Sequence, residues 1–598
     1  YSWDNCTNGI SRLCSLSNNN SNVNYSYDSH GRITGKTQSV GASPLTVSHT
    51  YNAAGQRIGS LSPGSQSIEY QWTGQHITAI TSNGQPVISQ ITYEPDGQIN
   101  GWTWGNNQLN ERFYDLAGRI AIVSLGVDAQ TQLTDSRYYG YDAAGRLIDA
   151  IDDSDPNLNQ RHEYDQLDRL IGSQRGESSL SRIDYSYDLS GNRTGKIKDN
   201  ASQYSYSTDA NSNRLQSQSG AQTVSYSYDP AGNLTGDGRF THSYNSAGRR
   251  IATTDTATGH TISYGYDAIG QRVSKTNGGN TTQYVYDEQG HLIGEYDATG
   301  QLIQEIIWLG DLPVAVLKPT IPASATTDIY YIHADHLGTP RKITRPNDNR
   351  VVWSWESEAF GNSLPDQNPS GLGTFVFNLR FPGQYYDAET GLHYNMARYY
   401  NPRIGGYDQS DPIGLAGGIN TYSYVRNNPL RYTDPLGLLV NAVLDTSTNT
   451  LTVTDQDTGA SIAVSAFTGG HVDATGMITS PGYNSQEIPA PNSVYSLTEN
   501  PNVTPGHEDW FGLIRQDNRI DDYMNDNGTT RSGFRLHSGE TSWGCATVNQ
   551  YSPGADNNWI QIKNLINNTS TSTLDFRTGP HWYNGTTQLI NYGTLTIK

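Results

Sequence analysis

The chain has few cysteines, few methionines and few charged residues. Three of its 598 residues are cysteine, three are methionine, and 16% are charged. Three cysteines cannot build a disulfide framework: Cys6 and Cys14 are either a pair or two free thiols, and Cys545 is left over. A run of 18 apolar residues is also absent, so we expect no membrane-spanning helix.

Basic residues are scarcer than acidic ones. The chain has 38 Lys and Arg against 58 Asp and Glu, which gives a formal net charge of −20. Because phosphate backbones are bound by basic surfaces, we expect no nucleic acid as the main partner. The sequence starts at Tyr1, with neither a methionine nor a signal peptide. We therefore expect a fragment or a processed piece of a longer protein.

Tyrosine, glycine, serine, threonine and asparagine are abundant. The chain contains 40 tyrosines and 61 glycines. Tyrosine and threonine favour strands, while glycine and asparagine favour tight turns, so the composition predicts a mainly β protein. Its length exceeds what one core usually holds, which predicts several domains or an array of repeats.

One motif recurs through residues 1–319. It reads Tyr-x-Tyr-Asp, then two or three residues, then Gly followed by Arg, Asn, Gln or His, and then an apolar stretch. Alternation places both tyrosines on one face of a strand. The aspartate begins a turn and the glycine supplies a positive φ, so each copy predicts one β-hairpin. Clear copies begin at Tyr25, Tyr139, Tyr185, Tyr226, Tyr264 and Tyr284, and weaker copies at Tyr51, Tyr93, Tyr114, Tyr164 and Tyr244.

This motif resembles the tyrosine-aspartate (YD) repeats of Rhs proteins. The resemblance implies hairpins that spiral into a hollow β-shell, a cocoon that encloses another domain. Taken without the resemblance, the repeats predict only a continuous sheet with a tyrosine-rich face. Such a sheet is equally consistent with an adhesion surface or a carbohydrate-binding wall.

Residues 320–438 contain the sequence Asp-Pro-x-Gly-Leu twice, beginning at Asp411 and Asp434. Each copy is a tight turn in its own right, because proline fixes φ and glycine permits a positive φ. The segment is similar to the core and plug of Rhs proteins and of related insecticidal-toxin subunits. That resemblance implies an aspartyl autoprotease in which the two aspartates share a proton and activate water. It also implies a cut between Leu438 and Leu439, with Arg403 as the accompanying arginine.

Residues 439–598 are long enough for one small domain with several strands. The stretch GFRLHSGETSWGCATV, residues 533–548, contains Cys545, and His537 precedes it by eight positions. A thiol is a nucleophile only as the thiolate, and an imidazole commonly takes its proton. Gly544 allows the backbone to approach a substrate closely, so the N–H groups of Gly544 and Cys545 are candidates for an oxyanion hole.

The order of strands and the His…Ser-x-Gly-Cys signature resemble the L,D-transpeptidase (YkuD-type) fold, in the branch delivered by type VI secretion. Trp543 stands where that family usually has a second histidine. The resemblance implies a small, mainly β domain that acts on peptidoglycan stem peptides at the diaminopimelate–D-alanine bond. Cys545 would attack the carbonyl, His537 would act as the base, and the main-chain carbonyl of Ser538 would orient the imidazole.

The same resemblance implies where the substrate is held. Arg535, Ser542 and Thr547 are candidates to bind its carboxylates and amides, because arginine binds a carboxylate through two parallel hydrogen bonds. The outcome is either hydrolysis by an L,D-carboxypeptidase or transfer to an amine. We expect no cofactor and no metal.

Two other chemistries are weighed for this domain. A papain-like amidase or endopeptidase places its histidine after the cysteine, and His581 could serve in that role. A zinc site of Cys545, His537, His507 and His471 has no paired ligand spacing to support it.

Together these features predict an antibacterial Rhs effector, with an autoproteolytic shell around a cysteine enzyme. The expected division is 1–319 for the YD-repeat shell, 320–438 for the plug and 439–598 for the toxin. The expected partners are peptidoglycan stem peptides, a cognate immunity protein, a secretion spike or delivery module, and a chaperone. The effector would be made in the cytoplasm, secreted, and delivered to the periplasm of a target cell. The alternative is a non-enzymatic YD-repeat adhesion or binding protein.

Overall fold

The computed structural model describes residues 1–435, apart from residues 42, 96, 128–133, 177–180, 321–325 and 413–418. From residue 440 on it describes the backbone of the strands. The chain divides into two compact units. The first comprises Tyr1–Phe113, Ile120–Ser410 and Asn420–Pro435, and the second Tyr114–Arg119, Asp411–Ile419 and Leu436–Lys598. The regular structure is almost entirely β, which confirms the expected fold class.

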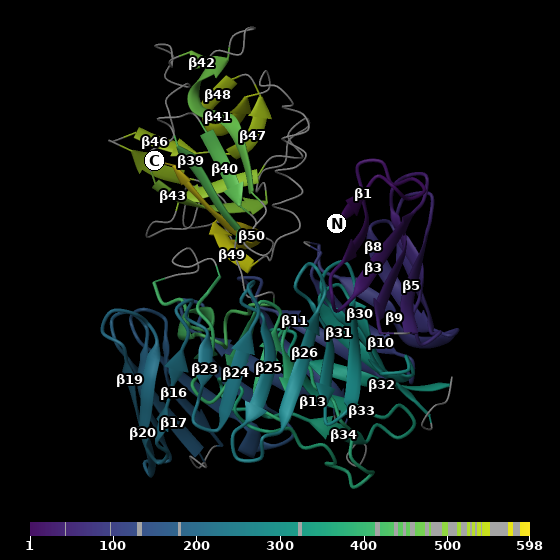
Figure 1. Ribbon diagram of the computed structural model, residues 1–598, viewed down its shortest axis with the longest axis vertical. Coiled ribbons are helices and arrows are strands. Elements are labelled where there is room, and N and C mark those ends of the chain that lie inside the picture. The colour runs from purple at the N-terminus through teal and green to yellow at the C-terminus, as the bar shows by residue number, and fades with distance from the viewer. Residues whose placement is uncertain are drawn as a thin grey trace. The chain divides into compact units, whose positions relative to one another are not determined.

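The first unit contains two long antiparallel sheets. Strands β1 (Ser2–Trp3) to β21 (Val224–Ser225) form a sheet of 21 strands, and β22 (Ser227–Tyr228) to β34 (Val351–Ser354) form one of 13. Strands that follow one another in the sequence are paired. Figure 1 shows β23 (Leu234–Gly236), β24 (Phe240–Tyr244), β25 (Arg250–Asp255) and β26 (Thr261–Tyr266) side by side. The predicted succession of hairpins is confirmed.

The hairpin of β13 (Thr134–Tyr141) and β14 (Leu147–Asp152) shows why the motif folds in this way. The Asp142 carboxylate accepts hydrogen bonds from the backbone N–H groups of Ala144 and Arg146, at 3.0 and 2.9 Å. It also accepts one from Nε of Arg146, at 2.7 Å. Gly145 adopts a φ of +76°, which a side chain would disfavour. One aspartate therefore organises the whole turn.

Neighbouring repeats are joined by the same residue types. The hydroxyl of Tyr164 donates to the main-chain carbonyl of Leu147 in the preceding repeat, at 2.7 Å. The guanidinium of Arg146 lies over the Tyr164 ring, 5.4 Å from its centroid, and donates to the carbonyl of Asp165 at 3.1 Å. The next repeat makes the same contacts, since the hydroxyl of Tyr187 donates to the carbonyl of Leu170.

A four-stranded antiparallel sheet completes the first unit. It consists of β35 (Tyr385–Asp387), β36 (Leu392–Asn395), β37 (Arg398–Asn401) and β38 (Gly406–Tyr407). Its tyrosines other than Tyr386 are buried in one cluster with aromatic residues of the 13-stranded sheet. Arg272, also buried, lies over the ring of Tyr394 and forms an ion pair with Asp387 at 2.5 Å. This packing fixes the strands that carry the candidate site.

Two shorter features belong to the first unit. Cys6 and Cys14 form a disulfide, which settles the alternative that the sequence left open. Short 3₁₀ turns occur at Pro156–Leu158 and Val425–Asn427. Among the described residues, no helix is long and apolar enough to cross a membrane.

The second unit contains a mixed sheet of ten strands and a separate pair, β45 (Tyr523–Asp526) and β46 (Thr529–Ser532). In the mixed sheet, β47 (Arg535–Gly539) lies between β44 (Phe511–Arg515) and β48 (Thr541–Asn549) and runs parallel to β48. The strands of this sheet are β39 (Val440–Asp445), β40 (Thr450–Thr454), β41 (Ser461–Val472), β42 (Ile478–Thr479), β43 (Ser493–Glu499), β44 (Phe511–Arg515), β47 (Arg535–Gly539), β48 (Thr541–Asn549), β49 (Ser572–Arg577) and β50 (Thr586–Ile597).

Candidate functional site

Asp434 is held by two side chains from neighbouring strands. Tyr407, on β38, donates its hydroxyl to Oδ2 of Asp434 at 2.6 Å. Arg398, on β37, donates from Nη2 to the same oxygen at 3.2 Å. The Arg398 side chain is only 3% exposed, and its guanidinium lies 3.6 Å from the centroid of the Tyr407 ring. Together these two hydrogen bonds fix the position of the Asp434 carboxylate.

Asn395 fixes the main chain around Asp434. Its Nδ2 donates to the main-chain carbonyl of Asp434 at 3.0 Å and to the hydroxyl of Tyr407 at 2.8 Å. Gly383 lies against the next residue, and a Cβ at Gly383 would collide with the carbonyl of Pro435. The backbone that leads towards residue 436 is therefore positioned as firmly as the carboxylate.

The electrostatic environment keeps Tyr407 protonated. Burial, together with the Asp434 carboxylate, raises the pKa of Tyr407 well above its ordinary value, although Arg398 acts in the opposite direction. Tyr407 is thus a hydrogen-bond donor to Asp434 over the whole physiological pH range.

The other residues expected at this site lie in different settings. Asp411 is buried and belongs to the second unit, whereas Asp434 belongs to the first, so a shared proton between them stays a prediction. Arg403 pairs with Asp237 at 3.3 Å and its side chain is 44% exposed. The arginine that pairs with Asp434 is Arg398. Leu438 and Leu439 lie outside the described residues.

Residues of the expected cysteine site lie on β47 and β48. The register pairs Leu536 with Ala546 and His537 with Thr547. Cys545 immediately precedes Ala546, the partner of Leu536. It therefore lies two positions before Thr547, the partner of His537. The remaining candidates are on the same two strands: Arg535 and Ser538 on β47, and Ser542, Gly544 and Thr547 on β48. Of the histidines weighed as alternatives, His471 is on β41, whereas His507 and His581 lie outside the described residues.

One group of carboxylates within the described residues is close enough to hold an ion. It consists of Asp135, Asp152 and Asp153. Lys342 pairs with Asp135, and Arg137 pairs with Asp152 at 2.9 Å. Because two of the three carboxylates already pair with cations, we assign no metal to the cluster.

Two protein families match parts of the chain. The teneurin YD-shell matches residues 136–430, and the Tlde1 domain matches residues 478–574, a range that contains both His537 and Cys545. A solved structure of the TcdB2-TccC3 toxin covers 73% of this chain, with a TM-score of 0.60 and 18% identity. This chain spans 25% of that one, and at this identity the likeness shows the fold alone.

Curated relatives include two proteins named as enzymes. The double-stranded DNA deaminase toxin A of Burkholderia cenocepacia is 27% identical over 448 residues, which cover 70% of this chain. The probable deoxyribonuclease RhsA of Dickeya dadantii is 26% identical over 470 residues, which cover 71% of this chain. The chain spans 30% of the length of each relative.

These names correct two of our expectations. They denote enzymes that act on DNA, and so they contradict a peptidoglycan L,D-transpeptidase or carboxypeptidase and a partner set without nucleic acid. The net charge of −20 was a weak basis for excluding nucleic acid. It is a sum over the whole chain and does not report the local field at a binding site.

Proposed function

The chain belongs to the YD-shell proteins of the Rhs type, and from this premise we propose that it is a toxin that cuts itself between Leu438 and Leu439. The shell, residues 1–319, and the plug, residues 320–438, would enclose the segment 439–598 and release it after the cut. The main support for this proposal is the set of hydrogen bonds that position Asp434. Arg398 and Tyr407 bond its carboxylate, and Asn395 bonds its main-chain carbonyl. Asp434 lies four residues before the proposed cleaved bond.

In the proposed reaction, Asp434 and Asp411 share one proton. Arg398 and Tyr407 hold the Asp434 carboxylate in place through hydrogen bonds to its Oδ2. The Asp434 carboxylate takes a proton from water while the oxygen attacks the carbonyl carbon of Leu438. As the tetrahedral intermediate collapses, the carboxyl group of Asp434 returns this proton to the nitrogen of Leu439. The C–N bond breaks, Leu439 leaves as an amine, and Leu438 keeps the new carboxyl group.

The test compares two arginines by denaturing electrophoresis of the purified chain. We expect two fragments from the wild type and one intact band from Asp434→Asn. Arg398→Lys, which loses the planar guanidinium, should slow the cut at least tenfold. Arg403→Lys is the matched control and should cut at the wild-type rate. Equal rates for Arg398→Lys and Arg403→Lys would refute the assignment of Arg398.

For the released segment we propose a cysteine-dependent toxin, with Cys545 as nucleophile and His537 as base. The support is the parallel pairing of β47 with β48, which brings the two positions close in register. In this proposal Ser538 orients the imidazole, Gly544 and Cys545 form the oxyanion hole, and Arg535, Ser542 and Thr547 hold the substrate.

To find the substrate, the segment 439–598 is expressed in bacteria and directed either to the cytoplasm or to the periplasm. Growth arrest in one compartment, relieved by Cys545→Ala, supports the cysteine and shows where the target is. The purified domain is then offered a panel that includes DNA and transfer RNA, as the names of the relatives suggest. Unchanged toxicity of Cys545→Ala would refute the role of the cysteine.

A further inference from the structure

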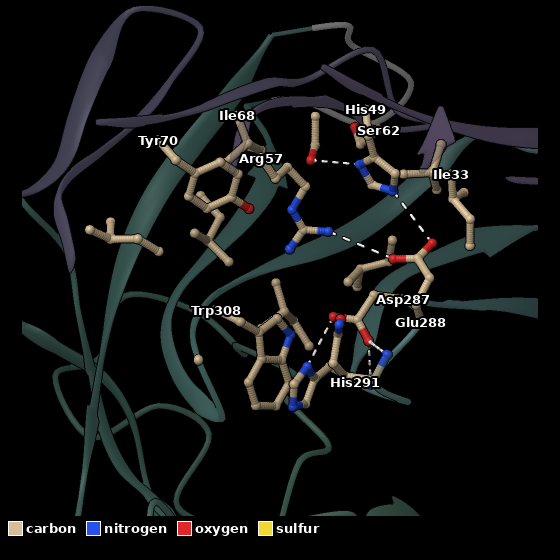
Figure 2. Close-up of a pocket in the computed structure, with 18 of the residues that line it drawn as sticks. Ile33, His49, Arg57, Ser62, Ile68, Tyr70, Asp287, Glu288, His291 and Trp308 are labelled. Atoms are coloured by element: carbon tan, nitrogen blue, oxygen red, sulfur yellow. Dashed lines mark hydrogen bonds and ion pairs between the residues drawn. The ribbon is translucent and has the colours of Figure 1, made fainter. Parts of the chain in front are cut away.

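The first unit contains a cavity of about 620 Å³ that none of the functions above uses. Figure 2 shows its lining. Five strands contribute from one side: β4 (Ile33–Val40), β5 (Ser43–Tyr51), β6 (Arg57–Leu61), β7 (Ser67–Thr73) and β8 (His76–Ser82). The other side is formed by β29 (Leu292–Asp297), β30 (Leu302–Leu309), β31 (Leu312–Pro319) and the turn before β29. A cavity of this volume is typical of small-molecule sites.

The apolar walls combine aliphatic side chains with four large aromatic ones. Tyr51, Tyr70 and Trp72 line the cavity from one side and Trp308 from the other. The indole N–H groups of Trp72 and Trp308 donate to main-chain carbonyls, at 2.9 and 3.0 Å. These two side chains therefore offer a ligand only their carbon surfaces. Flat aromatic surfaces of this kind bind ligands through apolar contact and ring faces.

Three polar side chains meet at one place in the cavity, where Figure 2 shows Arg57 and His49 directed towards Glu288. Nε2 of His49 lies 3.4 Å from Oε1 of Glu288, and Nη1 of Arg57 lies 3.7 Å from Oε2. Both distances exceed that of a well-formed hydrogen bond. The opposite nitrogen of His49, Nδ1, is 2.9 Å from Oγ of Ser60, so the ring orientation is fixed.

These polar groups have unused hydrogen-bonding capacity. Within the part of the chain that the structure describes, Nε2 of His49 has no hydrogen-bond partner, although the side chain is only 3% exposed. In the same part, the guanidinium of Arg57 makes no hydrogen bond and contacts only Glu288 and the Tyr70 ring. Buried polar groups in native proteins are normally satisfied, so Nε2 of His49 is available to bond a ligand or water in the cavity.

The charges at this place select against a charged ligand. Glu288 would repel an anion and Arg57 would repel a cation. Burial alone would raise the pKa of Glu288, but its contacts with His49 lower that pKa to about 2, so the carboxylate is ionised. The other acids that line the cavity already have partners: Asp287 and Asp311 both pair with His291 at 2.9 Å, and Glu305 accepts a hydrogen bond from the hydroxyl of Tyr296 at 2.5 Å.

An uncharged ligand that both donates and accepts hydrogen bonds fits this site. A pair of adjacent hydroxyl groups can donate to Glu288 and accept from Arg57 and His49. The apolar face of a sugar ring can pack on the aromatic walls. We propose that the cavity is a binding site for an uncharged saccharide, with its hydroxyls on Arg57, His49 and Glu288 and its ring against the aromatic side chains.

The test is a titration of the purified full chain, followed by tryptophan fluorescence and by calorimetry. The probes are glucose, galactose, mannose and their disaccharides, with glucuronic acid and glucosamine as charged analogues. We expect at least one neutral sugar to bind, and the charged analogues to bind at least tenfold more weakly.

Two variants locate the site. Arg57→Met keeps the side-chain stem but removes the donors, and Glu288→Gln removes the charge; each should weaken sugar binding at least tenfold. Arg161→Met, at an arginine that is 71% exposed and outside the cavity lining, is the matched control. Melting temperatures identify any variant that does not fold. Such a variant is replaced by Ser60→Ala, which removes the partner of Nδ1 of His49. The proposal is overturned if no neutral sugar binds, if the charged analogues bind best, or if the folded variants bind as the wild type does.

Discussion

At the scale of single residues, the repeat depends on an aspartate, a tyrosine and an arginine with separate tasks. The aspartate and glycine close the turn, as the sequence predicts. The tyrosine hydroxyl and the arginine also bind the neighbouring repeat, which the motif alone does not reveal. The reason is that their acceptors are main-chain carbonyls about 20 residues away, such as that of Leu147 for Tyr164. Residue types can suggest which side chains pair with one another. They cannot single out a main-chain acceptor, because every residue has a carbonyl.

The first prediction concerns this bond between repeats. Tyr164→Phe leaves the carbonyl of the buried Leu147 without its donor, and a lost hydrogen bond of this kind costs about 1–2 kcal/mol. We expect a lower melting temperature by calorimetry. Tyr138→Phe is the control, since that ring is 43% exposed. Equal melting temperatures for the two variants would show that the bond between repeats contributes nothing.

The second prediction concerns pH. Burial lowers the pKa of His291, but its bonds to Asp287 and Asp311 outweigh burial and raise the pKa to about 9. A pKa raised in the folded state gives stability that is complete below about pH 6.5 and lost as pH rises through 9. The size is up to about 3 kcal/mol, reduced by solvent screening because Asp311 is exposed.

The measurement is the melting temperature between pH 6 and 10. The wild type should lose stability across this range, whereas His291→Gln should be less stable at pH 6 and should lose less as pH rises. His30→Gln, at an exposed turn residue, is the control and should follow the wild type. A His291→Gln curve that runs parallel to that of the wild type would contradict the assignment.

At the scale of elements, the short sheet from β35 to β38 determines the candidate site. The sequence indicates Asp434 through its Asp-Pro-x-Gly-Leu turn, and the resemblance to Rhs proteins implies Arg403 as the accompanying arginine. The structure adds Arg398 and Tyr407, because β37 and β38 lie side by side and both side chains bond Asp434. Such a neighbour across a strand pair cannot be read from spacing alone. The cavity is even less visible in the sequence, since His49 and Glu288 are separated by more than 200 residues.

The third prediction tests how this sheet holds the cleavage segment. Gly383 has a φ of +81° and lies against the carbonyl of Pro435, so Gly383→Ala should displace that carbonyl and slow the cut at least tenfold. Gly391→Ala is a matched control: its φ is +74°, but a Cβ there meets no atom within 4 Å. Both variants carry similar backbone strain, of about 1–2 kcal/mol. Electrophoresis should show slow cleavage in Gly383→Ala only, and equal rates would contradict the contact.

At the scale of the whole molecule, tyrosine and glycine content and the repeat predict a β architecture of hairpins, and the sheets of 21 and 13 strands agree with it. The strand register and the packing of aromatic side chains into a shared cluster depend on contacts between distant residues. A local sequence pattern does not reveal such contacts. The identity of the toxin chemistry was the weakest inference. The predicted peptidoglycan chemistry depends on the order of strands and a short signature around Cys545, and the exclusion of nucleic acid depends on a charge summed over the chain. The names of the relatives contradict both predictions.

The central claim is that the chain cuts itself before the segment 439–598. The most direct measurement is intact-mass spectrometry of the purified wild-type chain and of Asp434→Asn, both under denaturing conditions. We predict two masses for the wild type, with a boundary between Leu438 and Leu439, that sum to the 65.6 kDa of the chain plus one water. Asp434→Asn should give one intact mass. A single mass of 65.6 kDa for the folded wild type, or a boundary elsewhere, would contradict the account.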